Sequence, residues 1–201
     1  YLLTANYSGR TVAAHPLSPD GSLGPASDVL ALTGHGRDPI RQAVSHPHHL
    51  AVRPGDGELA VADLGADVVH RAGFDDRTGR FERDPSSLPM PSGSGPRQIA
   101  FSPAGDVAYV LGELDSSLTV VDWSSGRPQV VESLPALAMA LPGSLAATLV
   151  LSSDGRSLRT SHRGADVITT FEVDGTSVRP RSSCSSGGRG QIGRASCRER
   201  V

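Results

Sequence analysis

Apolar and polar residues alternate over short segments along most of this chain, and small turn residues separate the segments. The alternation is clear in 107–111 and in 118–121, where it predicts short strands with one buried face. Turn signals stand between such segments, at 103–106 (Pro-Ala-Gly-Asp) and at 153–156 (Ser-Asp-Gly-Arg). Glycine supplies the positive φ that a tight hairpin needs, and proline presets the first turn residue. The pattern therefore predicts an all-β chain built from hairpins.

The same pattern returns about every fifty residues. Four segments share it, and they begin at Leu2, Leu50, Ile99 and Leu149. Each full copy contains an apolar strand, a turn, a second strand, a polar corner and a third strand. The corners align at Asn6, Asp63, Gly112 and His162, which are 57, 49 and 50 residues apart. A period of this length with three or four strands is typical of a β-propeller blade.

The length of the repeat sets how many blades the chain can form. At roughly fifty residues per blade, residues 1–178 predict about three and a half blades of antiparallel sheet. Propellers close into rings of about 4–8 blades. We therefore expect a partial β-propeller, with the missing blades of the same ring as its partner.

Composition excludes two classes of partner. Glycine and proline, 23 and 15 residues, are abundant, as many turns require. The formal net charge of −2 and the absence of a basic stretch argue against nucleic-acid binding. The chain has no run of 18 apolar residues, so a membrane-spanning helix is not expected.

The composition changes at Arg179. Residues 179–201 are rich in Ser, Gly and Arg, which predicts a disordered or artefactual tail. Within it, 191–201 (QIGRASCRERV) looks like a common sequencing adapter read in one frame. Both cysteines, Cys184 and Cys197, lie in this tail. The remaining chain has none, which fits a reducing compartment and leads us to expect a cytoplasmic protein.

Several motifs together resemble a known family. They read SHPHHLAV, LAVADLGADVV, SGSGPRQIAFSPAGDVAYVLGELDSSLTVVD and SHRGADVITTFEVDG. In combination they are similar to the lactonase family of seven-bladed propellers, and the resemblance covers about residues 1–178. The best-known activity of that family is 6-phosphogluconolactonase, and a fungal carboxy-muconate lactonising enzyme is a relative.

The resemblance also implies a catalytic site of one His, two Arg and one Glu. Matched motif by motif, these residues are His48, Arg97, Glu113 and Arg163. The residue before the Glu and before the second Arg is usually Asn in the family, and here these positions hold Gly112 and His162. No cofactor is implied.

The repeat supports this set independently. His48 and Arg97 each stand 15 residues before a corner, and Glu113 and Arg163 each follow a corner directly. In an antiparallel hairpin, the start of one strand and the end of the next lie at the same edge. All four side chains are therefore expected on one axial face of the propeller.

Other interpretations of these residues stay open. Arg97 and Glu113 could form an ion pair across the hairpin with a structural role only. His46, His48 and His49 could be metal ligands, although no carboxylate stands at a suitable spacing. The aspartates at 63, 67, 115 and 166 are expected to cap corner turns. The glycines at 93 and 95 lack the Lys and helix of a phosphate loop, and no G-x-S-x-G elbow is present.

The residues and the resemblance together favour a metal-independent hydrolase that opens a small sugar lactone, with 6-phosphogluconolactone as the first expectation. A Glu, a His and two Arg can supply an activated water, an oxyanion donor and a proton for the leaving alcohol. The alternatives are a lactonising cycloisomerase and a non-catalytic propeller that binds protein partners.

Overall fold

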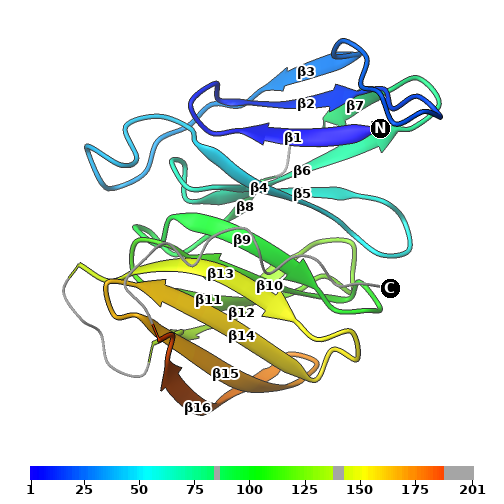
Figure 1. The fold of residues 1–201 in the computed structure, drawn as a ribbon. Helices are drawn as coiled ribbons and strands as arrows, with labels where there is room; N and C mark the ends of the chain where they lie inside the picture. Colours follow the sequence, from blue (N-terminus) through cyan, green and yellow to red (C-terminus); the bar gives the residue numbers. More distant parts are fainter. Residues whose placement is uncertain (84–86, 138–142, 188–201) are drawn as a thin grey trace. The chain divides into compact units, whose positions relative to one another are not determined.

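The computed structural model describes residues 1–83, 87–137 and 143–187, and every regular element in these ranges is a β-strand. The chain forms two compact units, Tyr1–Pro96 and Arg97–Val201. Each unit holds two antiparallel sheets (Figure 1). The prediction of an all-β chain is confirmed. Among the described residues no helix is long and apolar enough to cross a membrane.

The first unit contains one three-stranded and one five-stranded sheet. The three-stranded sheet has the order β1-β2-β3, with bounds Leu2–Asn6, Thr11–His15 and Asp28–Ala31. The other runs β4-β5-β6-β7, with bounds Pro47–Val52, Leu59–Asp63, Val68–Asp75 and Arg80–Arg83. The short strand β8 (Leu88–Pro89) pairs with the beginning of β6. The paths β1-β2-β3 and β4-β5-β6-β7 are up-and-down meanders, as expected for a blade, and β8 lies off the second path.

The second unit contains two four-stranded meanders. The first is β9-β10-β11-β12, with bounds Pro96–Phe101, Val107–Gly112, Ser117–Asp122 and Gln129–Pro135. The second is β13-β14-β15-β16, with bounds Leu145–Leu151, Ser157–Arg163, Val167–Asp174 and Ser177–Ser185. Together the described sheets agree with the predicted three and a half blades.

The two predicted hairpin turns lie where the sequence placed them. The Gly105 N–H donates to the Ser102 carbonyl at 2.9 Å, and Gly155 makes the same bond to Ser152 at 2.9 Å. Both glycines have positive φ, 72° and 70°, which other residues adopt only with strain. A serine hydroxyl closes each turn by donating to an aspartate, at 2.6 Å in both copies.

The four corners share a backbone conformation that confirms the register of the repeat. Four places after each aligned corner, a residue other than glycine has a φ between 51° and 56°; these are Arg10, Asp67, Ser116 and Asp166. The carbonyl of each accepts a backbone hydrogen bond from the segment that follows the outer strand, from Leu32, Met90, Ala136 and Ser186 respectively. The corner therefore reverses the direction of the chain. Its left-handed residue also holds the segment after the outer strand of the same sheet through a backbone hydrogen bond.

One corner of the first unit has no room for a side chain. A Cβ added at Gly65 would lie 1.8 Å from the Val44 carbonyl oxygen, far inside contact distance. Beside it, the buried Asp63 carboxylate accepts the N–H groups of Gly65 and Ala66, at 3.0 and 3.1 Å. The predicted capping role of Asp63 is thus observed.

Each unit has its own apolar core between its sheets. In the second unit the largest fully buried members are Tyr109, Leu111, Leu118, Leu149, Leu158 and Phe171. The side chain of Gln98 on β9 links the two sheets by bonding both backbone groups of Leu149 on β13, at 2.9 and 3.0 Å. An amide side chain can replace a peptide group in this way because it carries the same donor and acceptor.

The boundary predicted at residue 178 is wrong. Residues 179–185 belong to β16, where Glu172 pairs with Arg179 and Val167 pairs with Ser185. Of this strand only Val178 is buried. An outer strand held by backbone hydrogen bonds needs no apolar side chains, so composition could not reveal it. Residues 188–201, which include the adapter-like segment and Cys197, lie outside the described residues.

Candidate active site

Three of the four predicted site residues meet in the second unit, around the carboxylate of Glu113. One oxygen, Oε2, lies 3.0 Å from Arg97 Nε, and the other, Oε1, lies 3.1 Å from Arg163 Nη2. Both guanidinium groups therefore contact the same carboxylate, one at each oxygen.

The strand order explains why these residues meet. Arg97 lies at the beginning of β9, Glu113 directly follows β10, and Arg163 is the last residue of β14. In two adjacent antiparallel strands, the beginning of one strand lies beside the end of the other, at the same end of the sheet. The Ala146 N–H donates to the Glu113 carbonyl at 3.1 Å, which joins the edges of the two sheets.

A backbone carbonyl that sequence reasoning missed completes this cluster. The Ala146 carbonyl oxygen accepts from Arg97 Nε at 3.2 Å and from Arg163 Nη2 at 3.3 Å. The same donor atoms also contact Glu113, so each guanidinium is held by two acceptors. No side-chain signal could have identified Ala146, because its contribution is a carbonyl oxygen placed by strand β13.

Burial differs across the cluster. The Glu113 side chain is 4% exposed, whereas Arg97 and Arg163 are 18% and 25% exposed. The Glu113 side chain is thus more deeply buried than the two arginine side chains, which are partly exposed. A carboxylate with two cations at ion-pair distance is favoured in its charged form. The buried Nε of Arg163 has no hydrogen-bond partner among the described residues.

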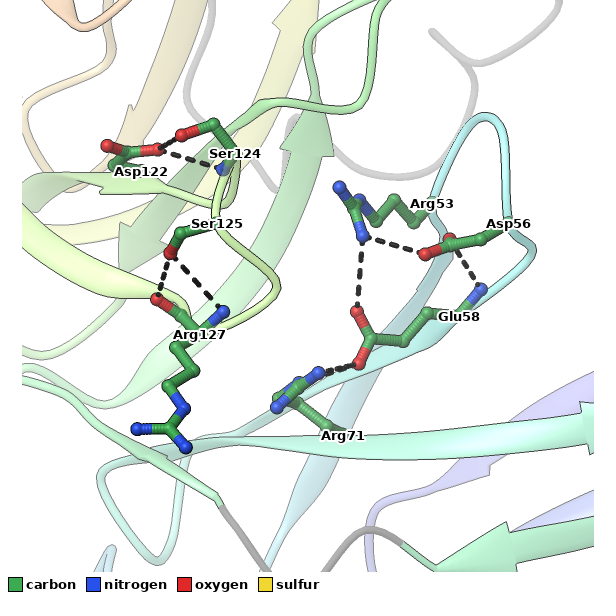
Figure 2. A network of polar contacts seen from close by, with 8 residues as sticks. All are labelled: Arg53, Asp56, Glu58, Arg71, Asp122, Ser124, Ser125 and Arg127. Carbon is green, nitrogen blue, oxygen red and sulfur yellow. Dashed lines mark hydrogen bonds and ion pairs between the residues drawn. The ribbon is translucent and has the colours of Figure 1, made fainter.

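A second carboxylate in the molecule also lies between two arginines, and the comparison is informative. Figure 2 shows Glu58 between Arg53 and Arg71. Arg53 also contacts Asp56 at 2.7 Å, and the Glu58 side chain is 15% exposed. Two arginines around a glutamate are therefore not specific to a catalytic site. The Glu113 cluster differs in its more deeply buried carboxylate.

The fourth predicted residue, His48, belongs to the first unit. It lies in β4, where the pairing register shifts between Pro47 and His49. Its ring meets the Tyr7 ring edge-on, with centroids 5.7 Å apart, and it is half-buried. The structure thus brings Arg97, Glu113 and Arg163 together and describes His48 in a separate unit.

The residues considered for a metal or a phosphate have other contacts. His46 stacks on Tyr7 at a centroid distance of 4.3 Å. Within the described ranges no group of three His, Cys, Asp or Glu residues is arranged to hold a metal ion. The N–H groups of Gly93 and Gly95 point at the Asp67 carboxylate, at 2.7 and 2.9 Å. This glycine-rich loop therefore binds an anion, which is a side chain of the protein itself.

His162 lies directly before Arg163 and is fully buried. Burial lowers its pKa from the ordinary 6.5, and a weaker contribution from the Ala136 backbone opposes this shift. Its Nε2 lies 3.0 Å from Thr160 Oγ1. The neutral imidazole is thus part of the packing that supports the end of β14.

This burial predicts a pH-dependent stability. Because the folded-state pKa of His162 is below its unfolded value, its stabilising effect is complete above about pH 6.5 and is lost as the pH falls toward the folded pKa. We expect the free energy of unfolding, measured with urea, to fall less between pH 7.5 and 5.5 in His162→Asn than in the wild type. His35→Asn, at an exposed loop position, is the control. An unchanged slope in His162→Asn would contradict the prediction.

Comparison with known proteins finds relatives that match most of this chain. The chain is 35% identical over 175 residues to an uncharacterised protein of Lactococcus lactis, with 84% of this chain and 49% of that protein covered. It is 31% identical over 179 residues to a 6-phosphogluconolactonase of Bacillus subtilis, with 87% and 50% covered. The chain therefore spans about half the length of the curated relatives it matches.

A solved structure agrees with the sequence comparison. The periplasmic gluconolactonase of Pseudomonas aeruginosa superposes with a TM-score of 0.83 at 34% identity, over 94% of this chain and 55% of that one. The blade-like sheets, the repeat and these relatives point to the same fold. Residues 1–194 match the family described as Lactonase, 7-bladed beta-propeller, and the chain belongs to this family.

Proposed function

We propose that the protein carrying this chain hydrolyses sugar lactones, with 6-phosphogluconolactone as its substrate. The observation that carries this proposal is the buried Glu113 carboxylate held between Arg97 and Arg163. The names of the Bacillus subtilis and Pseudomonas aeruginosa relatives support the reaction class.

In the proposed mechanism, Glu113 acts as the general base. Its charged carboxylate orients a water and takes a proton from it as the oxygen attacks the lactone carbonyl carbon. Arg163, the more exposed of the two arginines, donates to the developing oxyanion. The ring C–O bond then breaks, and the leaving alkoxide takes up a proton, for which His48 is the proposed donor.

Two further expectations belong to this proposal. The ring is completed by further blades, since the chain spans about half of its curated relatives. The protein is cytoplasmic, because the sequence outside 179–201 has no cysteine to form disulfides. The Pseudomonas aeruginosa relative is named as periplasmic, so cell fractionation of the full-length protein is the direct check of location.

The test compares lactone hydrolysis, corrected for the spontaneous rate, in the wild type, Arg163→Ala and Arg127→Ala. Loss of an oxyanion donor typically lowers the rate about 10²–10³-fold, and we expect this for Arg163→Ala with 6-phosphogluconolactone. Arg127 is an exposed turn residue and its variant should keep the wild-type rate. If the protein hydrolyses only unphosphorylated gluconolactone, 6-phosphogluconolactone is not its substrate and this part of the proposal is wrong. No opening of any sugar lactone would favour a ring-closing or binding function.

A further inference from the structure

A serine, a histidine and an aspartate form a continuous hydrogen-bonded chain in the first unit, outside the Glu113 cluster. Ser87 Oγ lies 2.9 Å from His70 Nδ1, and His70 Nε2 lies 3.0 Å from Asp63 Oδ2. The strand register explains the arrangement. Val69 pairs with Leu88, so Ser87 stands opposite His70, and Asp63 is a diagonal neighbour of His70 on β5.

The aspartate is held rigidly in its charged form. Its side chain is fully buried and accepts hydrogen bonds from Ser45 Oγ and from the N–H groups of His46, Gly65 and Ala66. Burial alone would raise the pKa of Asp63, but hydrogen bonds from His70, Ser45 and a backbone N–H outweigh it and hold that pKa below its usual value. An ionised carboxylate only accepts, so it orients the imidazole that faces it.

The direction of the remaining hydrogen bond follows from this. Because Asp63 accepts, Nε2 of His70 is the donor to it, and in the tautomer with its hydrogen on Nε2 the Nδ1 atom keeps its lone pair. Ser87 then donates its hydroxyl hydrogen to Nδ1. The His70 side chain is 15% exposed and Ser87 is half-buried, so neither residue is fully enclosed in the core.

We propose that Ser87 is a nucleophilic hydroxyl activated by His70 and Asp63, and that it accepts acyl groups from small activated esters. A nucleophile, a base and an orienting carboxylate define such a site by geometry, whatever their order in the sequence. The absence of a G-x-S-x-G elbow therefore does not exclude it.

The reaction proceeds in two balanced steps. Ser87 Oγ bonds to the ester carbonyl carbon while its proton passes to His70 Nδ1, and Asp63 stabilises the imidazolium. The carbon–oxygen bond to the alcohol then breaks, and the alcohol leaves with the proton from Nδ1. Water enters by the same path, and hydrolysis of the acyl-serine releases the carboxylic acid and restores the hydroxyl.

If Ser87 had only a structural role, its hydrogen bond to His70 would connect β8 to β6. The hydroxyl would then not be more reactive than that of another serine. The second unit contains a matched comparison, shown in Figure 2: Ser124 Oγ donates to Asp122 at 2.7 Å without an imidazole between them. Ser124 is exposed, so its access to a reagent is at least as good as that of Ser87. Any excess reactivity of Ser87 therefore reports activation.

The test treats the full-length protein with p-nitrophenyl acetate and, separately, with diisopropyl fluorophosphate, and maps the modified peptides by mass spectrometry. We expect a p-nitrophenol burst of about one equivalent, and Ser87 modified at least about 10²-fold faster than Ser124. His70→Gln should remove this excess, and Ser87→Ala should remove the burst. Circular dichroism verifies that each variant is folded. Equal rates at Ser87 and Ser124 in the wild type, or an unchanged Ser87 rate in folded His70→Gln, would overturn the proposal.

Discussion

Glu113→Gln is expected to lower the rate of lactone hydrolysis by about 10²–10⁴-fold, the usual contribution of a general base. Glutamine keeps the size of the side chain but cannot take a proton from water. The measurement is kcat for 6-phosphogluconolactone opening in the full-length protein, corrected for spontaneous hydrolysis. The loss should appear in kcat, because the amide can still occupy the space between Arg97 and Arg163.

Glu58→Gln is the matched control for this experiment. Glu58 also lies between two arginines, at Arg53 and Arg71, but in the other unit and with a more exposed carboxylate. We expect its variant to keep the wild-type kcat. A folded Glu113→Gln protein with the same kcat as Glu58→Gln would show that the Glu113 cluster is a structural ion pair.

Gly65→Ala is expected to cause the largest loss of stability among single small substitutions. The added Cβ would lie 1.8 Å from the Val44 carbonyl oxygen and 2.8 Å from the His46 nitrogen, so backbone must move. The movement would also disturb the hydrogen bond from the Gly65 N–H to Asp63. Overpacking typically costs about 1–3 kcal/mol and occasionally more. We expect about 3 kcal/mol less free energy of unfolding, measured with urea.

The control for the glycine experiment is Gly24→Ala. A Cβ at Gly24 would meet only the Pro16 ring at 3.6 Å, which is ordinary contact, and its backbone conformation suits other residues. Its free energy of unfolding should stay within about 0.5 kcal/mol of the wild type. Similar losses in both variants would show that the corner at Gly65 can relax, contrary to the prediction.

Local sequence signals were sufficient where the structure depends on neighbouring residues. The hairpin glycines at 105 and 155 have the positive φ that their turns predicted. The repeat register is confirmed by the left-handed residues that follow each corner, from Arg10 to Asp166. The resemblance selected Arg97, Glu113 and Arg163, and the structure brings these three together.

Sequence reasoning failed where backbone groups carry the interaction and where side chains from separate segments meet. The exposed strand β16 was missed because it is held by backbone pairing with β15. The Ala146 carbonyl was missed because every residue type carries a backbone oxygen, so the side chain gives no sign of this contact. The Ser87–His70–Asp63 chain was missed because its members come from three strands or loops and match no contiguous motif.

The amino-acid sequence alone specifies the β-rich repeat, its turns and the residue types of the candidate site, since these follow from local periodicity and turn chemistry. Which charged side chains come into contact follows only from the folded arrangement of the strands. Glu113 and Glu58 each lie near two arginines, but the packing of the two sheets in the second unit gives Glu113 the more deeply buried position. Burial and pairing distances depend on how strands from different repeats pack, and residue identity does not specify them.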